Sequence, residues 1–357
     1  MIPETMNAIQ LSGPGDFSLV HVPVPKPGPY ELLCRVESVT ICGTDPHIIH
    51  GDFPGFWPPG YPFIPGHEWA GVVVEADPLA REFGYDAGDR VCGISHSGCG
   101  YCDMCLSGRF TLCRNYGNHA LNHRQYGHTT QGAYAQFIRT TIKSVAAIPD
   151  DMDFDVAAMM DPLSIALHMV QRSGLKAGED ILINGTGPQG LFSILLARHM
   201  GAGRVIATGS GFRLEIAEKL GAIPVNYRTE QVVERVLELT AGRGAPRVLE
   251  CAGTPAGART ACDVVAKGGR IAMVGIPPEG DALLPVKKLV LDEIDLVGCR
   301  ANPNTLEQAI RMVAENNLDM KSFLTHRFPL RDFEKALDIF VHRRENSLKI
   351  AIKPNAR

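Results

Sequence analysis

Two short stretches in the first fifth of the chain carry side chains that commonly bind Zn²⁺. The segment from Cys42 to His47 reads Cys-Gly-Thr-Asp-Pro-His, and His67 and Glu68 follow a glycine further along the chain. A thiolate and an imidazole are typical ligands of zinc sites with mixed sulfur and nitrogen coordination. Glu68 and, much later, Asp161 could supply oxygen ligands. A lone Cys or His is more often a buried core residue, so this interpretation depends on the motifs that accompany it.

A second cysteine cluster lies between residues 99 and 113. Its members are spaced Cys99-x2-Cys102-x2-Cys105-x7-Cys113. Such spacing lets a short loop fold back so that four sulfurs meet tetrahedrally. A closed shell of four thiolates leaves no position for a substrate, so we expect a structural zinc site. The alternative is a redox-active Cys-x-x-Cys pair, which normally stands alone at the start of a helix.

A glycine-rich turn follows the apolar residues 181–184 and precedes an apolar helix predicted for residues 191–200. The first glycine of this Gly-x-Gly-x-x-Gly pattern permits the turn, the second lets the backbone approach a pyrophosphate, and the third lets the helix pack on the sheet. The helix N-terminus would then bind the phosphate. The candidate cofactor contacts are Gly185, Gly187, Pro188, Gln189 and Gly190. A plain strand-to-helix turn is the alternative.

The tip of the next predicted strand indicates which dinucleotide binds. NAD-preferring sites have an acidic residue there, which accepts from the ribose 2′-hydroxyl. Gly209 occupies that position, and no Asp or Glu occurs before Glu215. Ser210 and Arg213 follow, Arg binds phosphate bidentately, and Tyr227 could contact the same phosphate. We therefore predict NADP(H) as the preferred cofactor; NAD(H) is the alternative if Arg213 is only a solvated helix residue.

The length and composition set the broad class. A chain of 357 residues exceeds what one core usually supports, so two domains are expected. A net charge of −4 without a basic cluster argues against nucleic acid as a partner, and no apolar run is long enough to span a membrane. Ten unevenly placed cysteines in so long a chain favour metal ligation in a reducing compartment, so we expect a cytoplasmic protein.

The pattern of elements changes near residue 150. Residues 6–149 contain alternating or β-branched runs separated by Pro and Gly, which indicates a β-rich part. From residue 153 onward, short apolar strands alternate with helical patterns, which predicts a doubly wound parallel sheet. The expected strands include residues 180–184, 204–207, 247–250 and 269–274; a helix over 305–316 and a strand over 348–352 follow.

With these motifs in order, the chain resembles the zinc-dependent medium-chain dehydrogenase/reductase family, and within it the polyol (sorbitol-like) and threonine dehydrogenase branch. The segments that carry the resemblance are residues 42–47, 66–68, 99–113, 161–164, 298–300 and 325–330. The resemblance implies an α/β protein in which a Rossmann domain, residues 153–297, is inserted into a β-rich GroES-like catalytic domain, residues 1–152 and 298–357, with a structural zinc lobe at about 95–115. It also implies a homodimer or homotetramer, with the active site between the two domains.

The resemblance also implies a ligand set for the catalytic zinc. In the alcohol dehydrogenase branch the third ligand is a cysteine, whereas Asp161 stands where the polyol branch has an acid. In such relatives the residue equivalent to Glu68 can bind the metal while the later carboxylate holds a zinc-bound water. We assign Cys42 and His67 as ligands, and Glu68 and Asp161 share the remaining role. Asp45 is expected to accept from the His67 ring and to fix its tautomer.

A mechanism follows as a hypothesis. Zn²⁺ binds the substrate hydroxyl and lowers its pKa, and hydride passes from the carbinol carbon to the nicotinamide. The proton leaves through Thr44 and, by resemblance, through the nicotinamide ribose to His47. Val274, Gly275 and Ile276, at the end of a late strand, could contact the nicotinamide through their backbone, and Arg300 resembles the arginine that contacts the cofactor in the family.

The substrate is the least determined feature. Phe53, Phe56 and Trp57 could wall a pocket, or could be core residues, and the polar stretch 115–128 could border the substrate or be a solvated loop. A polar pocket favours a polyol, sugar, cyclitol or amino alcohol, because a buried unpaired polar group costs about 1–3 kcal/mol. A simple secondary-alcohol dehydrogenase or ketone reductase is the alternative enzyme, and a cofactor-binding structural zinc protein is the alternative outside enzymes.

Overall fold

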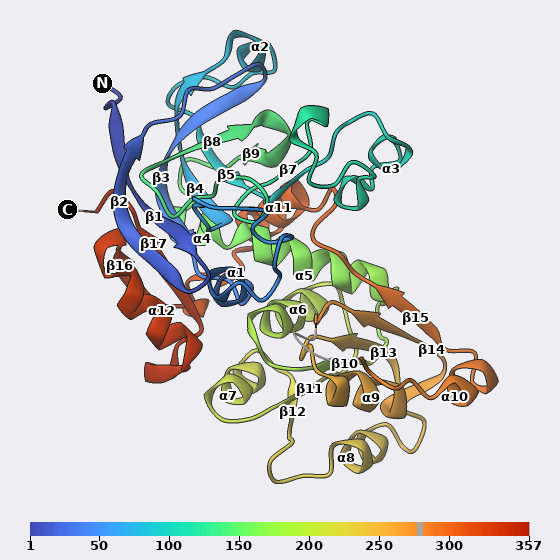
Figure 1. Cartoon of the computed structure of the whole chain (residues 1–357). Coiled ribbons are helices and arrows are strands. Elements are labelled where there is room, and N and C mark those ends of the chain that lie inside the picture. The colour runs from blue at the N-terminus through green and yellow to red at the C-terminus, as the bar shows by residue number, and fades with distance from the viewer. Residues whose placement is uncertain (277–280, 357) are drawn as a thin grey trace. The chain divides into compact units, whose positions relative to one another are not determined.

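The computed structural model describes residues 1–276 and 281–356. The chain forms two compact units, the first made of Met1–Asp161 and Asn302–Arg357 and the second of Pro162–Ala301 (Figure 1). The first unit therefore combines the two ends of the chain, and the second is one continuous segment. The boundaries expected from the sequence, residues 153 and 297, stay a prediction.

The first unit is built on a strongly paired, mainly antiparallel sheet of the order β16-β17-β3-β4-β5-β9, with β8 pairing with β3. Only the pair formed by the two C-terminal strands is parallel. The strands of this sheet are β3 (Glu31–Thr40), β4 (Glu68–Ala76), β5 (Arg90–Gly93), β8 (Phe137–Thr141), β9 (Val145–Ala147), β16 (Leu324–Pro329) and β17 (Lys349–Lys353). Two smaller pairs are β1 (Thr5–Gly13) with β2 (Asp16–Pro23), and β6 (His96–Ser97) with β7 (Arg124–Gln125).

Helices cover and close this first unit. Its α-helices are α1 (Asp45–His50), α2 (Pro78–Glu82), α3 (Asp103–Leu106), α4 (Phe154–Ala158), α11 (Leu306–Asn316) and α12 (Phe333–Val341). Short 3₁₀ turns lie at η1 (Phe110–Leu112), η2 (His119–Leu121), η3 (Ile142–Ser144), η4 (Lys321–Phe323), η5 (Leu330–Asp332) and η6 (Arg344–Asn346). The buried residues of α11 are Leu306, Ala309, Ile310 and Val313, one face of a helix with a period of 3.6 residues.

The second unit contains the predicted parallel sheet. In its described part the strand order is β12-β11-β10-β13-β14-β15, and every neighbouring pair is parallel. The strands are β10 (Ile181–Asn184), β11 (Val205–Gly209), β12 (Ile223–Asn226), β13 (Ala245–Glu250), β14 (Val265–Met273) and β15 (Asp295–Gly298). The chain proceeds from β10 to one side and returns to the other side at β13, so the switch in strand order lies next to β10, where such sheets bind ligands.

Helices of the second unit alternate with these strands, as the sequence pattern predicts. They are the remainder of α5 (Met160–Ser173), then α6 (Pro188–His199), α7 (Phe212–Lys219), α8 (Val232–Leu239), α9 (Pro255–Val264) and α10 (Val286–Leu291). Leu182, Ile206, Val248 and Ile271 are fully buried at the centre of the sheet. Continuous apolar strands of this kind are typical of parallel sheets that are covered on both faces.

Asp155 connects distant parts of the first unit. Its carboxylate, on α4, is 7 % exposed and accepts from the Ser38 hydroxyl at 2.6 Å, the Arg327 guanidinium at 2.6 Å and the Lys353 ammonium at 2.7 Å. These partners lie on β3, β16 and β17. Burial raises the pKa of Asp155, but Lys353, Ser38 and Arg327 outweigh it and hold the pKa below its usual value. One ionised carboxylate thus joins the N-terminal and C-terminal strands.

We expect Asp155→Asn to lower the free energy of unfolding by about 1–3 kcal/mol at pH 7, because hydrogen bonds to a buried charge are lost. The folded-state pKa lies below the unfolded value, so this contribution is complete above about pH 4 and is lost as the pH falls further. Urea unfolding of both proteins between pH 3 and 7 measures the difference. Asp263→Asn, which breaks the exposed pair with Arg259, is the control and should change stability by less than about 0.5 kcal/mol. A difference that stays constant down to pH 3 would contradict the assignment.

Candidate active site

Three of the predicted ligands lie together at one end of the antiparallel sheet. The Cys42 thiol, a ring nitrogen of His67 and a carboxylate oxygen of Glu68 all lie within 4.8 Å of one another. Strand pairing accounts for this, because Thr40, the last residue of β3, is opposite Glu68, the first residue of β4. Cys42 follows the end of one strand and His67 precedes the start of the other. His67 and Glu68 are only 4 % and 2 % exposed.

Asp45 lies beside the His67 ring, and its expected role in fixing the tautomer of that ring stays a prediction. The fully buried Asp45 carboxylate lies 3.5 Å from Nδ1 of His67. Its other oxygen accepts from the Cys42 backbone N–H at 2.8 Å and from the Tyr134 hydroxyl at 2.6 Å. Because Asp45 faces Nδ1, the nitrogen that remains for a metal is Nε2.

The electrostatics of this cluster suit a cation. Burial alone would lower the pKa of His67, but the Cys42 thiol and the Asp45 carboxylate raise it well above its ordinary value. Burial raises the pKa of Asp45, and His67 and Tyr134 more than offset this, so the pKa is lowered. A buried cluster of sulfur and oxygen groups that stabilises positive charge on an imidazole is suited to a divalent ion. The donor set therefore fits zinc.

The carboxylate of Glu68 has further partners that the sequence did not indicate. Its Oε2 accepts from the Thr40 hydroxyl at 2.5 Å and from the Lys349 ammonium. Lys349 is 1 % exposed and also donates to the backbone oxygen of Ile41 at 2.8 Å. The two charged residues are 281 positions apart, and the pairing of β17 with β3 brings them together. The buried charge on Glu68 is thereby compensated.

Asp161 lies outside the group of three but interacts with it electrostatically. It is the second residue of the long helix α5 and is 1 % exposed, and its Oδ1 accepts from the Asn302 amide at 2.7 Å. Burial, opposed by His67 and reinforced by Glu68, raises the pKa of Asp161 to about 6. The division of the oxygen-ligand role between Glu68 and Asp161 stays a prediction.

Thr44 and His47, the two residues proposed for proton transfer, flank this cluster. The Thr44 hydroxyl lies 3.5 Å from the Cys42 thiol, just before helix α1. His47, on α1, is partly exposed, and its Nδ1 lies 2.6 Å from a carboxylate oxygen of Asp52. The sequence analysis did not identify Asp52, although it follows the same short helix.

A group of aromatic rings packs against His67 of this cluster. The His128 ring lies 4.5 Å from the His67 ring, and Trp57 packs edge-on against His128 at 4.8 Å. The Trp57 indole N–H donates to the Tyr116 hydroxyl at 2.6 Å, and Phe56 stacks on both of these rings. The loop of aromatic residues and the polar stretch 115–128, which the sequence analysis considered separately, therefore form one assembly beside the candidate ligands.

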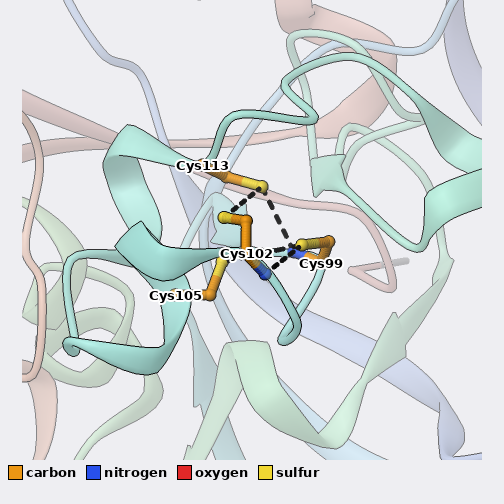
Figure 2. A group of neighbouring side chains, drawn as sticks. All are labelled: Cys99, Cys102, Cys105 and Cys113. Atoms are coloured by element: carbon orange, nitrogen blue, oxygen red, sulfur yellow. Dashed lines mark hydrogen bonds between the residues drawn. The ribbon is translucent and has the colours of Figure 1, made fainter.

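The four cysteines of the second cluster converge as predicted (Figure 2). Their thiols are free, and the sulfurs of Cys99 and Cys105, and those of Cys102 and Cys113, are 3.9 Å apart. A tetrahedral site with zinc–sulfur bonds of about 2.3 Å requires sulfurs about 3.8 Å apart, whereas a disulfide would need about 2.05 Å. The geometry of the sulfurs fits a zinc ion.

Polar groups around the Cys99 sulfur favour its thiolate form. The Cys99 sulfur accepts from the backbone N–H groups of Tyr101 and Cys102, both at 3.4 Å, and from the Asn115 amide at 3.3 Å. Burial raises the pKa of Cys99, but these donors bring it down to about 6. Gly98 is required at the turn, because a Cβ there would lie 2.5 Å from the Cys105 sulfur.

The glycine-rich turn has the geometry that a phosphate-binding loop needs. Gly185 follows β10 with a φ of +111°, a backbone conformation that favours glycine. Gly187 precedes helix α6 and has open space where a Cβ would lie. At Gly190 a Cβ would lie 1.8 Å from the Gly185 carbonyl oxygen, so the helix packs too closely for any side chain. Pro188 and Gln189 form the first turn of α6.

The other predicted cofactor contacts lie at the carboxyl ends of the same parallel strands. Gly209 ends β11 and is buried, and the Ser210 hydroxyl donates to the Tyr227 hydroxyl at 2.9 Å. Arg213 is half-buried on α7. The remaining residues follow β14 and β15; they are Val274, Gly275, Ile276 and Arg300. Arg228, an exposed cation beside Tyr227, is a further candidate that the sequence analysis did not identify.

We expect Cys99→Ser to remove one zinc ion per chain and to lower the melting temperature, because the site loses a thiolate ligand and the lobe loses its cross-link. Metal analysis of the purified protein measures the change. Cys262→Ala, which removes a buried thiol outside both clusters, is the control and should keep the zinc content of the wild type. An unchanged zinc content in Cys99→Ser would exclude the structural site.

We expect Lys349→Met to lower the stability of the first unit by about 3–5 kcal/mol, because it leaves a buried carboxylate without its cation. Both tryptophans, Trp57 and Trp69, lie in this unit, so denaturant unfolding followed by their fluorescence reports it. The double variant Lys349→Met/Glu68→Gln should recover much of the lost stability, because it no longer buries an uncompensated charge. The exposed Lys267→Met is the control. A loss below about 1 kcal/mol in Lys349→Met would contradict the charge compensation.

None of the helices within residues 1–276 and 281–356 combines the length and the apolar character that crossing a membrane requires.

Comparison with known proteins finds dehydrogenases, both among family models and among individual relatives. Residues 28–150 match the alcohol dehydrogenase GroES-like domain, and residues 188–315 match the zinc-binding dehydrogenase family. The chain is 32 % identical to the sorbitol dehydrogenase of Bacillus subtilis (strain 168) over 358 residues, covering 99 % of each protein. It is 35 % identical to the L-threonine 3-dehydrogenase of Escherichia coli (strain K12) over 324 residues, covering 90 % of this chain and 92 % of the relative.

Solved structures that resemble this chain are dehydrogenases as well. A zinc-binding dehydrogenase from Sinorhizobium meliloti 1021, solved bound to NADP, has a TM-score of 0.89 at 31 % identity and covers 99 % of this chain and 100 % of its own. The alcohol dehydrogenase TADH from Thermus sp. ATN1 has a TM-score of 0.88 at 27 % identity, covering 98 % and 99 %. The expected combination of a GroES-like domain and a Rossmann-type parallel sheet is thereby confirmed. The chain belongs to the zinc-dependent medium-chain dehydrogenase/reductase family, as an oxidoreductase of the polyol and threonine dehydrogenase branch.

Proposed function

We propose that the protein transfers hydride between a secondary alcohol of a polar substrate and NADP, with one catalytic and one structural zinc ion per chain. The substrate class is a polyol, sugar, cyclitol or amino alcohol. The observation that carries the proposal is the group formed by the partly exposed Cys42 and the buried His67 and Glu68, with the Thr44 hydroxyl beside the thiol. A structural zinc protein without catalysis would need only the four-cysteine lobe.

Cys42 and His67 would hold the catalytic zinc, with Glu68 or Asp161 supplying an oxygen. When bound, the metal supplies Lewis acidity that lowers the pKa of the substrate hydroxyl, and the nicotinamide accepts the hydride. Asp45 keeps the His67 ring in the orientation that ligation requires. Lys349 offsets the negative charge on Glu68 and so limits the excess negative charge around the metal.

The proton of the substrate hydroxyl would pass first to Thr44. Its hydroxyl can accept and donate at the same time, and it lies beside the candidate ligand Cys42. His47 is partly exposed and paired with Asp52, so it could exchange the proton with solvent. These side chains hold and move the proton, whereas Cys42 and His67 hold the metal.

Two features support NADP as the preferred cofactor. The tip of β11 has no acidic residue, the hydroxyls of Ser210 and Tyr227 meet there, and the next helix carries Arg213. Hydroxyl and guanidinium groups are good partners for a 2′-phosphate. The Sinorhizobium meliloti relative was solved with NADP. NAD remains the alternative.

Buried polar groups near the candidate ligands support a polar substrate. His128 lies against His67, and Tyr116, Gln125 and His123 continue the polar assembly, with Tyr116 donating to Gln125. The relatives named for sorbitol and L-threonine act on polar alcohols. The apolar faces of Phe56 and Trp57 favour the alternative, a simple secondary-alcohol dehydrogenase or ketone reductase.

Three further expectations complete the proposal: a homodimer or homotetramer, a small-molecule alcohol or ketone substrate without nucleic acid or membrane as partners, and a cytoplasmic location. These three expectations rest on the composition and on the family. Sedimentation or mass photometry of the purified protein would determine the oligomeric state.

The proposal is tested by following NADP⁺ and NAD⁺ reduction with a panel of alcohols, polyols, amino alcohols and cyclitols. We expect higher kcat/KM with NADP⁺ and with a substrate that carries several polar groups. A clear preference for short aliphatic alcohols would overturn the substrate class, and a preference for NAD⁺ would overturn the cofactor. No turnover with any of these substrates in zinc-loaded protein would favour the non-catalytic alternative.

We expect Thr44→Val to lower kcat by about 10²–10⁴-fold, the usual contribution of a positioned proton-transfer group. Thr44→Ser, which keeps the hydroxyl, is the matched control and should retain most of the activity. Steady-state kinetics, together with zinc content and cofactor affinity, separate loss of proton transfer from loss of binding. Full turnover in Thr44→Val with zinc and cofactor bound would exclude this role.

A further inference from the structure

We propose that Thr186, the residue between the first two glycines of the cofactor turn, is a determinant of cofactor specificity. Its side chain fills the space in which a side chain at position 209 would have to lie. It therefore prevents the chain from presenting an acidic residue at the tip of β11, the position from which NAD-preferring sites bind the ribose 2′-hydroxyl. The inference rests on the proposed use of NADP and adds a residue that enforces it.

The steric conflict involves most of the Thr186 side chain. A Cβ built on Gly209 would lie 2.1 Å from the Thr186 Oγ1, 2.9 Å from its Cγ2 and 3.0 Å from its Cβ. Ordinary van der Waals contact begins at about 3.4 Å. Any residue other than glycine at position 209, an acidic residue included, must therefore displace the Thr186 side chain.

Thr186 has little freedom to move away. It is 6 % exposed, and β-branching restricts the rotation of its side chain. The backbone on its N-terminal side is held by the Gly185 N–H, which lies 3.1 Å from the Thr208 carbonyl oxygen and 3.2 Å from the Thr208 hydroxyl. The close packing of Gly190 on Gly185 restrains the same turn. The two closest atoms, Oγ1 and Cγ2, are the ones that alanine at position 186 would remove.

The consequence is a coupling between two positions that are 23 residues apart in sequence. Exchanging Gly209 for an acid would not by itself produce an NAD site, because the acid could not reach its place. The hydroxyls of Ser210 and Tyr227, which lie beyond this obstructed position, stay the polar groups at the strand tip. Creating an NAD site requires a smaller residue at position 186 together with the acid at position 209.

The experiment compares the wild type with Gly209→Asp, Thr186→Ala and the double variant Thr186→Ala/Gly209→Asp. Thr186→Val/Gly209→Asp is the matched control, because valine keeps the volume of threonine. Melting temperatures are measured without ligand, and the Kd values of NADP⁺ and NAD⁺ are measured by calorimetric titration. None of these readouts requires turnover.

We expect Gly209→Asp and the valine control to melt at least about 3 °C below the wild type and to bind both dinucleotides weakly. The alanine double variant should melt close to Thr186→Ala alone. It should also bind NAD⁺ at least about tenfold more tightly than the wild type does, and NADP⁺ at least about tenfold more weakly, since a tenfold change corresponds to one good polar contact.

Two other results would overturn the inference, and they are distinguishable. The first is that the melting-temperature shifts of Thr186→Ala and Gly209→Asp add up in the double variant, or that the valine and alanine double variants have the same melting temperature and the same Kd values. Thr186 then does not obstruct position 209, whatever the cofactor is. If the wild type binds NAD⁺ more tightly than NADP⁺, the proposed cofactor is wrong, and the role of Thr186 in selecting it fails with it.

Discussion

The buried carboxylate of Glu68 is the constraint on which the candidate metal centre depends. A carboxylate that is 2 % exposed is unfavourable unless a cation and hydrogen-bond donors compensate it. The Thr40 hydroxyl and the Lys349 ammonium do this from the ends of two neighbouring strands, β3 and β17. Because β3 pairs with β4 and with β17, the register of the sheet fixes all three groups. The same register brings Cys42 and His67 together, so the ligand set depends on the pairing of these strands.

The two units meet the demands of the proposed reaction with different kinds of structure. The first unit holds its candidate ligands through side chains, and Asp45 is itself held by Tyr134 and by the Cys42 backbone. The second unit offers mainly backbone, because three glycines follow β10 and two of them, Gly185 and Gly190, pack too closely on other backbone for a side chain. In the proposed function, cofactor selectivity comes from the side chain that cannot be placed at the tip of β11 as well as from the groups that are present there. The proposed metal site depends on charge compensation, and the proposed cofactor choice depends on packing.

Much of this arrangement could be predicted from local sequence. Cys42, His67, the four-cysteine spacing and the glycine turn are short patterns whose chemistry depends on residues close in the chain, and the alternation of strands and helices after residue 150 predicted the parallel sheet. Lys349, Tyr134 and Thr186 were not identified, because their roles depend on strand register and on side-chain packing between distant segments. No local pattern distinguishes such a lysine from a solvated one. The position of Asp161 in the sequence likewise does not decide whether Asp161 or Glu68 supplies the oxygen ligand.

The central claim is that Cys42, His67 and an adjacent carboxylate hold a catalytic zinc ion in addition to the structural one. Anomalous diffraction from crystals of the protein, measured on both sides of the zinc absorption edge, tests this most directly. The account predicts two edge-dependent peaks per chain, one among the four sulfurs of the cysteine lobe and one within bonding distance of the Cys42 sulfur and the His67 Nε2. A single peak in the lobe, with zinc present in excess and no density between Cys42 and His67, would contradict the account.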